Sequence, residues 1–136
     1  MAKSQNPQDI RKASRMQEYE GVVQLLKDSS RKLEKLDAGI LNLSGQELQS
    51  RLRTGSSALQ SEYQTFLLRA NVARQVMAAV FAGAEAEPFG SGAPTDQQLQ
   101  RATKILAPSM SVRAQLNALE DVSSMLSTPS VSTSWD

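Results

Sequence analysis

The chain has 136 residues, of which 40% are apolar, and its 15 basic and 14 acidic side chains leave a formal net charge of +1. This length suits one modest domain, and a net charge near zero excludes a global field that would recruit nucleic acid or an anionic membrane. The absence of cysteine and histidine excludes disulfides and removes the usual metal ligands and general base. We therefore expect a protein that is not an enzyme, binds no cofactor and takes no small-molecule substrate.

The amino-terminal residues 1–6 are expected to be flexible, and Met1–Gln8 lacks the apolar stretch of a secretory signal. The richest apolar window, Val72–Ala82, contains Arg74 and Gln75 and is far shorter than the roughly 18 apolar residues of a membrane span. These features predict a soluble protein without a membrane span, in an intracellular or particle-associated location.

The first predicted helix runs from Pro7 to about Ala38. The Asn6 side chain can accept a hydrogen bond from an amide of the first turn, where Pro7 has no amide to leave unpaired. Gly39 can adopt the left-handed conformation that closes a helix. In the alternative, the helix continues to Leu43 and tolerates Gly39 at a cost of about 1 kcal/mol.

Apolar residues in this first segment recur with alternating gaps of three and four, a period that places a narrow seam along one side of a helix. Only Ser29 interrupts the pattern. Such a seam must pack against another helix, either of this chain or of a partner chain. The first seam consists of Tyr19, Val22, Leu26, Ser29, Leu33, Leu36, Ile40 and Leu43.

A basic stripe lies beside the first seam. It consists of Lys27, Arg31, Lys32 and Lys35. Three of these four residues share one side of the helix, so the stripe is a possible binding surface for anions. Asp28 and Glu34 interrupt it and no aromatic residue is interleaved, which favours a solvated or partner-facing side. Lys27 and Arg31 can also pair with acidic residues on a facing helix and set its register.

Ser44–Glu47 fits a capping box, which predicts a second helix from Gly45 to about Ala84. Within it, only Gly55 weakens the helix. Because the connection between the two helices is short, they are expected to form an antiparallel hairpin over residues 7–84.

A second seam with the same spacing runs along this helix. It consists of Leu59, Tyr63, Phe66, Ala70, Ala73, Met77 and Val80. Further apolar residues lie outside this seam, namely Leu67, Leu68, Val72, Val76 and Phe81. More than one side of the helix must therefore be covered. Either the carboxy-terminal helices fold back over it to complete a four-element bundle, or partner subunits cover it.

Residues 95–127 are predicted to hold two shorter helices. The first opens at the capping box Thr95–Gln98 and is stopped or kinked by Pro108. The second begins at Ser109 or Ser111 and carries another apolar stripe. This pair completes an all-α helical bundle built on the long hairpin.

Two segments are predicted to lack helix. Residues 85–94 contain two prolines and two glycines and are expected to be a linker. Residues 128–136 form a polar tail in which Trp135 is the one large apolar side chain. Trp135 is expected either to dock back on its own bundle or to insert into a neighbouring subunit.

The sequence favours a structural or assembly subunit of a larger complex or particle, in a homo- or hetero-oligomer. The two seams and Trp135 are its candidate protein interface. The alternative is an adaptor that binds nucleic acid or an anionic surface through the basic stripe.

Overall fold

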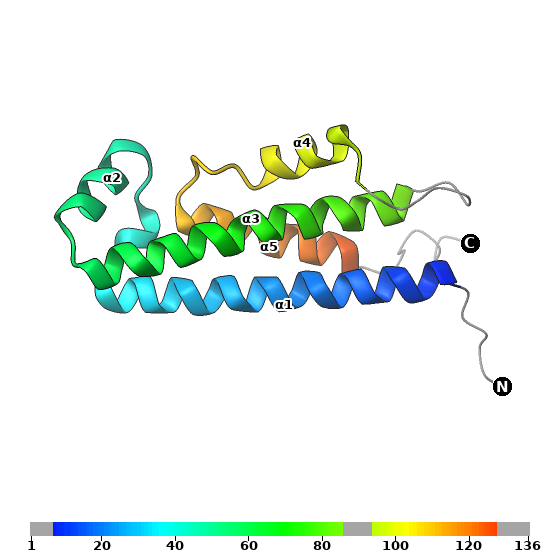
Figure 1. The fold of residues 1–136 in the computed structure, drawn as a ribbon, viewed down its shortest axis with the longest axis horizontal. Helices are drawn as coiled ribbons and strands as arrows, with labels where there is room; N and C mark the ends of the chain where they lie inside the picture. The colour runs from blue at the N-terminus through cyan, green and yellow to red at the C-terminus, as the bar shows by residue number, and fades with distance from the viewer. Residues whose placement is uncertain (1–6, 86–93, 128–136) are drawn as a thin grey trace.

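The computed structural model describes the backbone of residues 7–85 and 94–127, and side chains within residues 13–82 and 94–126. These ranges hold five α-helices, one short 3-10 helix and no strand, which confirms the all-α fold class. No helix in these ranges is long and apolar enough to cross a membrane. The elements are α1 (Pro7–Leu36), η1 (Ile40–Asn42), α2 (Gly45–Thr54), α3 (Ser57–Glu85), α4 (Asp96–Ile105) and α5 (Val112–Ser127), as Figure 1 shows.

Three predictions concern segments that lie mostly or wholly outside the described residues. They are the flexible amino terminus, the linker and the tail that carries Trp135. The predicted helices, by contrast, all fall within the described ranges.

α1 and α3 run antiparallel, side by side, and make the most extensive contact between any two elements (Figure 1). Every residue of the second seam is buried in the core. The first seam is also buried over most of its length, but Leu36 is 46% exposed. At the other end of the seam, Val22 is half-buried, and its neighbour Val23, which lies outside the seam, is buried. An α-helix of 3.6 residues per turn drifts against a 3.5-residue pattern, and this drift turns Leu36 out of the contact.

α1 ends at Leu36, two residues before the expected end and well short of the alternative end at Leu43. Gly39 closes this region with the predicted left-handed conformation, at φ 91°. The Ile40 amide donates to the Asp37 carbonyl at 3.1 Å, and Ile40 then joins the core from η1. The reversal of the chain thus begins directly after α1.

The prediction of one continuous helix after Ser44 was wrong, because the helix breaks at Gly55. Gly55 has extended backbone, and the hydroxyl of Ser56 accepts the Leu59 amide at 3.1 Å to begin α3. A Cβ atom at Gly55 would lie 2.6 Å from the Leu59 side chain and 3.0 Å from the Arg51 carbonyl oxygen. The break folds α2 back, so that Leu48 becomes buried. Burial of such a side chain stabilises the fold by about 1.5–3 kcal/mol. If α2 and α3 formed one straight helix, α2 would extend away from the bundle and Leu48 would stay exposed.

The two predicted capping boxes have different outcomes. At α4, the Gln98 amide donates to Thr95 Oγ1 at 3.2 Å and the Thr95 amide donates to Gln98 Oε1 at 2.8 Å, as predicted. At α2, Ser44 occupies the N-cap position but makes no side-chain capping bond. Gly45 follows at φ 60°, which departs from the helical geometry that a capping box requires.

Both carboxy-terminal helices pack on the hairpin, but only α4 packs mainly on α3. The guanidinium of Arg101 in α4 lies 4.3 Å from the centre of the Phe81 ring. α5 packs against α1 and η1 instead, and Tyr19 Oη donates to the Leu119 carbonyl at 2.7 Å. Ser111, one of the two expected starts, caps α5 by accepting the Ala114 amide at 3.1 Å. Figure 1 accordingly shows α4 beside α3 and α5 behind the hairpin.

Candidate functional site

The predicted interface residues of the two seams lie inside this chain. The second seam and most of the first seam fill the contact between α1 and α3, with Val22 half-buried and Leu36 exposed. A partner chain would therefore have to bind to other side chains. Trp135, the remaining candidate, lies outside the described residues.

The residues of the basic stripe do not act together as one cationic surface. Lys27 Nζ lies 2.6 Å from Glu120 Oε2 of α5, and Arg31 Nη1 lies 2.6 Å from Asp28 Oδ1 on its own helix. Lys32 and Lys35 are exposed. The pair between Lys27 and α5 fits the predicted role in setting register, and it reduces the positive charge that the stripe offers to an anion.

A polar groove of about 560 Å³ lies between α1 and α5. Its lining residues are Glu20, Gly21, Val23, Gln24, Lys27, Glu120, Ser123 and Ser124. Lys27, its one cation, is paired with Glu120 across the groove. Within the described ranges, no group of three acidic side chains is arranged to hold a metal ion. The groove therefore gives weak support to a binding site for an anion or a metal.

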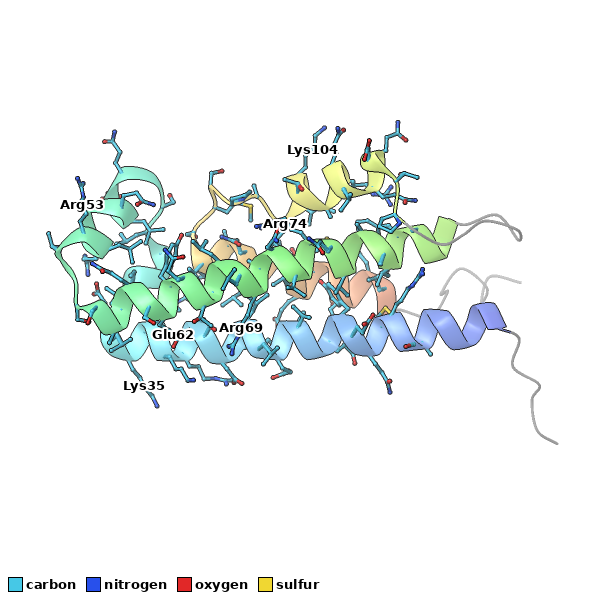
Figure 2. All side chains as sticks on the ribbon, viewed as in Figure 1. Lys35, Arg53, Glu62, Arg69, Arg74 and Lys104 are labelled. Atoms are coloured by element: carbon cyan, nitrogen blue, oxygen red, sulfur yellow. The ribbon has the colours of Figure 1, made fainter. Side chains whose placement is uncertain are left out.

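The charged side chains that the structure describes in α3 are turned toward neighbouring helices (Figure 2). Among its described side chains, those of residues 57–82, the charged ones are Glu62, Arg69 and Arg74, and each is half-buried. Figure 2 shows Glu62 and Arg69 between α3 and α1, and Arg74 on the side of α4. The other side chains described for α3 carry no charge.

The two arginines hold the neighbouring segments through hydrogen bonds. Arg69 Nη1 donates to the Leu25 carbonyl at 2.9 Å and to Ser29 Oγ at 2.7 Å. Arg74 Nη1 donates to the Leu106 carbonyl at 3.1 Å. Burial lowers the pKa of Arg74 from its usual value, because a low dielectric disfavours the charged form. Both side chains thus serve the packing of this chain.

The outer side of α3 carries a second run of residues with gaps of three and four. We call this run the outer stripe, and it consists of Ala58, Ser61, Thr65, Leu68, Val72, Gln75 and Ala79. None of its members is charged. Leu68 is 69% exposed and Val72 is 47% exposed, although both belong to the apolar excess that the sequence predicted to be covered. α4 and α5 leave these two side chains open.

The edge of α1 lies beside the outer stripe. Arg15 Nη1 donates to the Ala79 carbonyl at 3.0 Å, near one end of the stripe, and Arg69 reaches Leu25 near its middle. Leu25 itself is 44% exposed. The outer stripe and this edge of α1 together form a continuous surface, which we call the α1–α3 face.

Sequence reasoning identified Leu68 and Val72 as apolar excess but did not identify the outer stripe. The signal that points to it is the scarcity of charge in α3, since a helix side that faces water normally carries charged residues. The residues of the outer stripe are uncharged and spaced three and four apart, as are the anchor positions of helices that bind in a groove. The chain matches no protein-family model, no curated protein sequence and no solved structure.

Proposed function

We propose that the chain is a non-enzymatic assembly subunit that binds another protein chain through the outer stripe of α3. The observation that carries this proposal is the exposure of Leu68 and Val72 within a stripe that has no charge. The occupant would be a helix that lays its apolar side along α3.

The length and composition of the outer stripe support protein binding over chance exposure. Single exposed apolar residues are common on protein surfaces and need no explanation. The outer stripe, however, runs from Ala58 to Ala79, about 32 Å at 1.5 Å per residue. Depletion of charged residues marks the centre of protein interfaces, and helix recognition uses anchors three and four residues apart.

The alternative function, an adaptor for nucleic acid or an anionic surface, has weaker support. Phosphate binding depends on cations that are available to displace counterions. Lys27 and Arg31 are each engaged with a carboxylate, so two of the four basic-stripe residues are partly neutralised. The outer stripe, which has no charge, favours an apolar partner by contrast.

Site-specific photo-crosslinking tests the proposal in cells that express the full chain. A photoreactive amino acid replaces Leu68 in one variant and Met125 in a matched variant. Met125 is an apolar side chain of α5 with nearly the same exposure, 70% against 69%. We expect a discrete crosslinked protein species from position 68 that is absent from position 125.

Substitution within the stripe makes the test specific. In the chain with the photoreactive residue at position 68, Val72→Glu places a charge beside the crosslinker and should abolish the crosslink. Equal crosslinking from positions 68 and 125, or a crosslink that survives Val72→Glu, would contradict the proposal. Identification of the crosslinked peptide by mass spectrometry then tells whether the bound chain is a second copy or a different protein.

A further inference from the structure

We infer that the chain docked on the α1–α3 face is a second copy of this protein, bound antiparallel about a two-fold axis. This inference rests on the proposed function, because it names the partner of the same surface. It is carried by the placement of charge along α1 and by the register between α1 and α3.

Three exposed residues of α1 recur at intervals of seven, Glu18, Leu25 and Lys32. This spacing keeps them on one side of the helix with a small drift. The acidic residue and the basic residue stand at equal distances from Leu25, on opposite sides of it. Neither Glu18 nor Lys32 forms an ion pair with another described side chain.

The outer stripe of α3 has its centre at the same level of the molecule. Leu68 and Val72 flank the middle of the stripe, and Arg69 between them donates to the Leu25 carbonyl at 2.9 Å. The bond from Arg15 to the Ala79 carbonyl fixes the same antiparallel register further along the hairpin. The centre of the charge pattern on α1 therefore lies beside the centre of the stripe on α3.

The two-fold axis passes through this shared centre, lies in the plane of the interface and crosses both helices at right angles. It brings matching groups of the two copies together. It stacks α3 on α3, so that Leu68 meets the partner's Val72. It also stacks α1 on α1, where Glu18 meets the partner's Lys32, and the same pair forms a second time by symmetry. A two-fold axis parallel to the helices would instead stack α1 on the partner's α3, so neither charge would meet its opposite.

The size of the α1–α3 face suits a dimer. Two helices spaced about 10 Å apart make a face about 20 Å wide. Over a stripe length of about 32 Å, this gives roughly 600–700 Å² per copy, which reaches the lower end of the range for specific interfaces. The stripe has no charge that such a contact would have to strip of water without compensation.

Sedimentation equilibrium of the purified full chain tests the inference through charge reversal. The wild-type chain should form dimers. Glu18→Lys and Lys32→Glu each place two like-charge pairs in the dimer and should raise the dissociation constant about tenfold or more. Both residues are exposed, so circular dichroism should report unchanged helix content in either variant.

Mixing the two single variants gives the decisive measurement. In a heterodimer of the Glu18→Lys chain with the Lys32→Glu chain, both cross-subunit pairs are again attractive, so association should return toward the wild-type level. The double variant should likewise dimerise. A wild-type chain that stays monomeric at high concentration, or single variants that do not recover on mixing, would overturn the inference. A crosslink from position 68 to a different protein would overturn it too, while still supporting the proposed assembly function.

Discussion

α1 and α3 are of similar length, 30 and 29 residues, and they pack against each other along most of that length, yet they distribute charge in opposite ways. α1 carries exposed charges of both signs. Among the side chains described for α1, those of residues 13–36, they are Glu18, Glu20, Asp28, Arg31, Lys32, Glu34 and Lys35. α3 has three charged residues among its described side chains, and all three are half-buried against neighbouring helices.

The two helices therefore present different surfaces to their surroundings, one charged and one uncharged. The inferred dimer pairs only Glu18 and Lys32 of these charges. The rest of the outer side of α1 is suited to water, because charged side chains keep a surface solvated and oppose association. The outer side of α3 lacks that protection, and its two arginines stabilise contacts within the chain instead. α3 is therefore the helix on which a partner can dock with the least loss of hydration.

The largest expected effect on the free energy of unfolding comes from placing a charge on the buried side of α3, compared with the exposed side of α1. Ala73 is buried in the core, and Ala73→Glu places a carboxylate where nothing compensates its loss of water. We expect a loss of about 3–5 kcal/mol in the free energy of unfolding, or failure to fold. The matched Ala13→Glu change on exposed α1 should alter stability by less than about 0.5 kcal/mol. Urea denaturation followed by circular dichroism measures both, and a similar loss in the two variants would contradict the contrast.

The arginines give a second test of the same contrast. Arg69→Met removes the hydrogen bonds to Leu25 and Ser29 and should cost about 1–2 kcal/mol. Arg31→Met removes only an exposed ion pair within one turn of α1 and should cost at most about 0.5 kcal/mol. The thermal midpoints of the two variants provide the comparison, and an Arg69→Met variant as stable as the wild type would refute the role of this arginine.

A substitution at Tyr19 tests the contribution of the buried side of α1 to stability. Tyr19→Phe removes the bond to the Leu119 carbonyl and should cost about 1 kcal/mol at neutral pH. Burial raises the pKa of Tyr19 above its usual value near 10. The unfolded chain then releases this proton more readily than the folded one, so stability is complete below about pH 10 and falls as the pH rises above it. Denaturation between pH 7 and pH 11 should show a shallower alkaline decline for Tyr19→Phe, and an unchanged slope would argue against the assignment.

The smallest effect is a gain in stability. Gly21 is an exposed residue within α1, and apart from its chain neighbours and the backbone of its own helix no atom lies within 4 Å of the position its Cβ would take. Gly21→Ala should therefore stabilise the chain by about 0.5–1 kcal/mol through improved helix propensity. A rise in thermal midpoint is the expected readout. A fall would indicate that the groove between α1 and α5 is narrower in solution than in the structure.

The hairpin could be predicted from sequence because it depends on local periodicity. Alternating gaps of three and four define which side of a helix is buried, whatever covers it, and all seven residues of the second seam are indeed buried. The break at Gly55 could not be predicted in this way. The break is accompanied by the close approach of the Leu59 side chain to Gly55, where a Cβ would not fit, and by the burial of Leu48, which depends on where α2 lies after the chain bends.

The sequence by itself determined the helical class, the two seams, the left-handed closure at Gly39 and the capping box at Thr95, because each depends on residues within a few turns of one another. Only the tertiary structure decided which apolar residues stay exposed. Phe81, four residues after Met77 of the second seam, is covered by α4, whereas Leu68 and Val72 lie on the opposite side of α3 and stay exposed. The difference depends on how many sides of α3 the other helices of this chain can reach, and they leave the outer stripe uncovered.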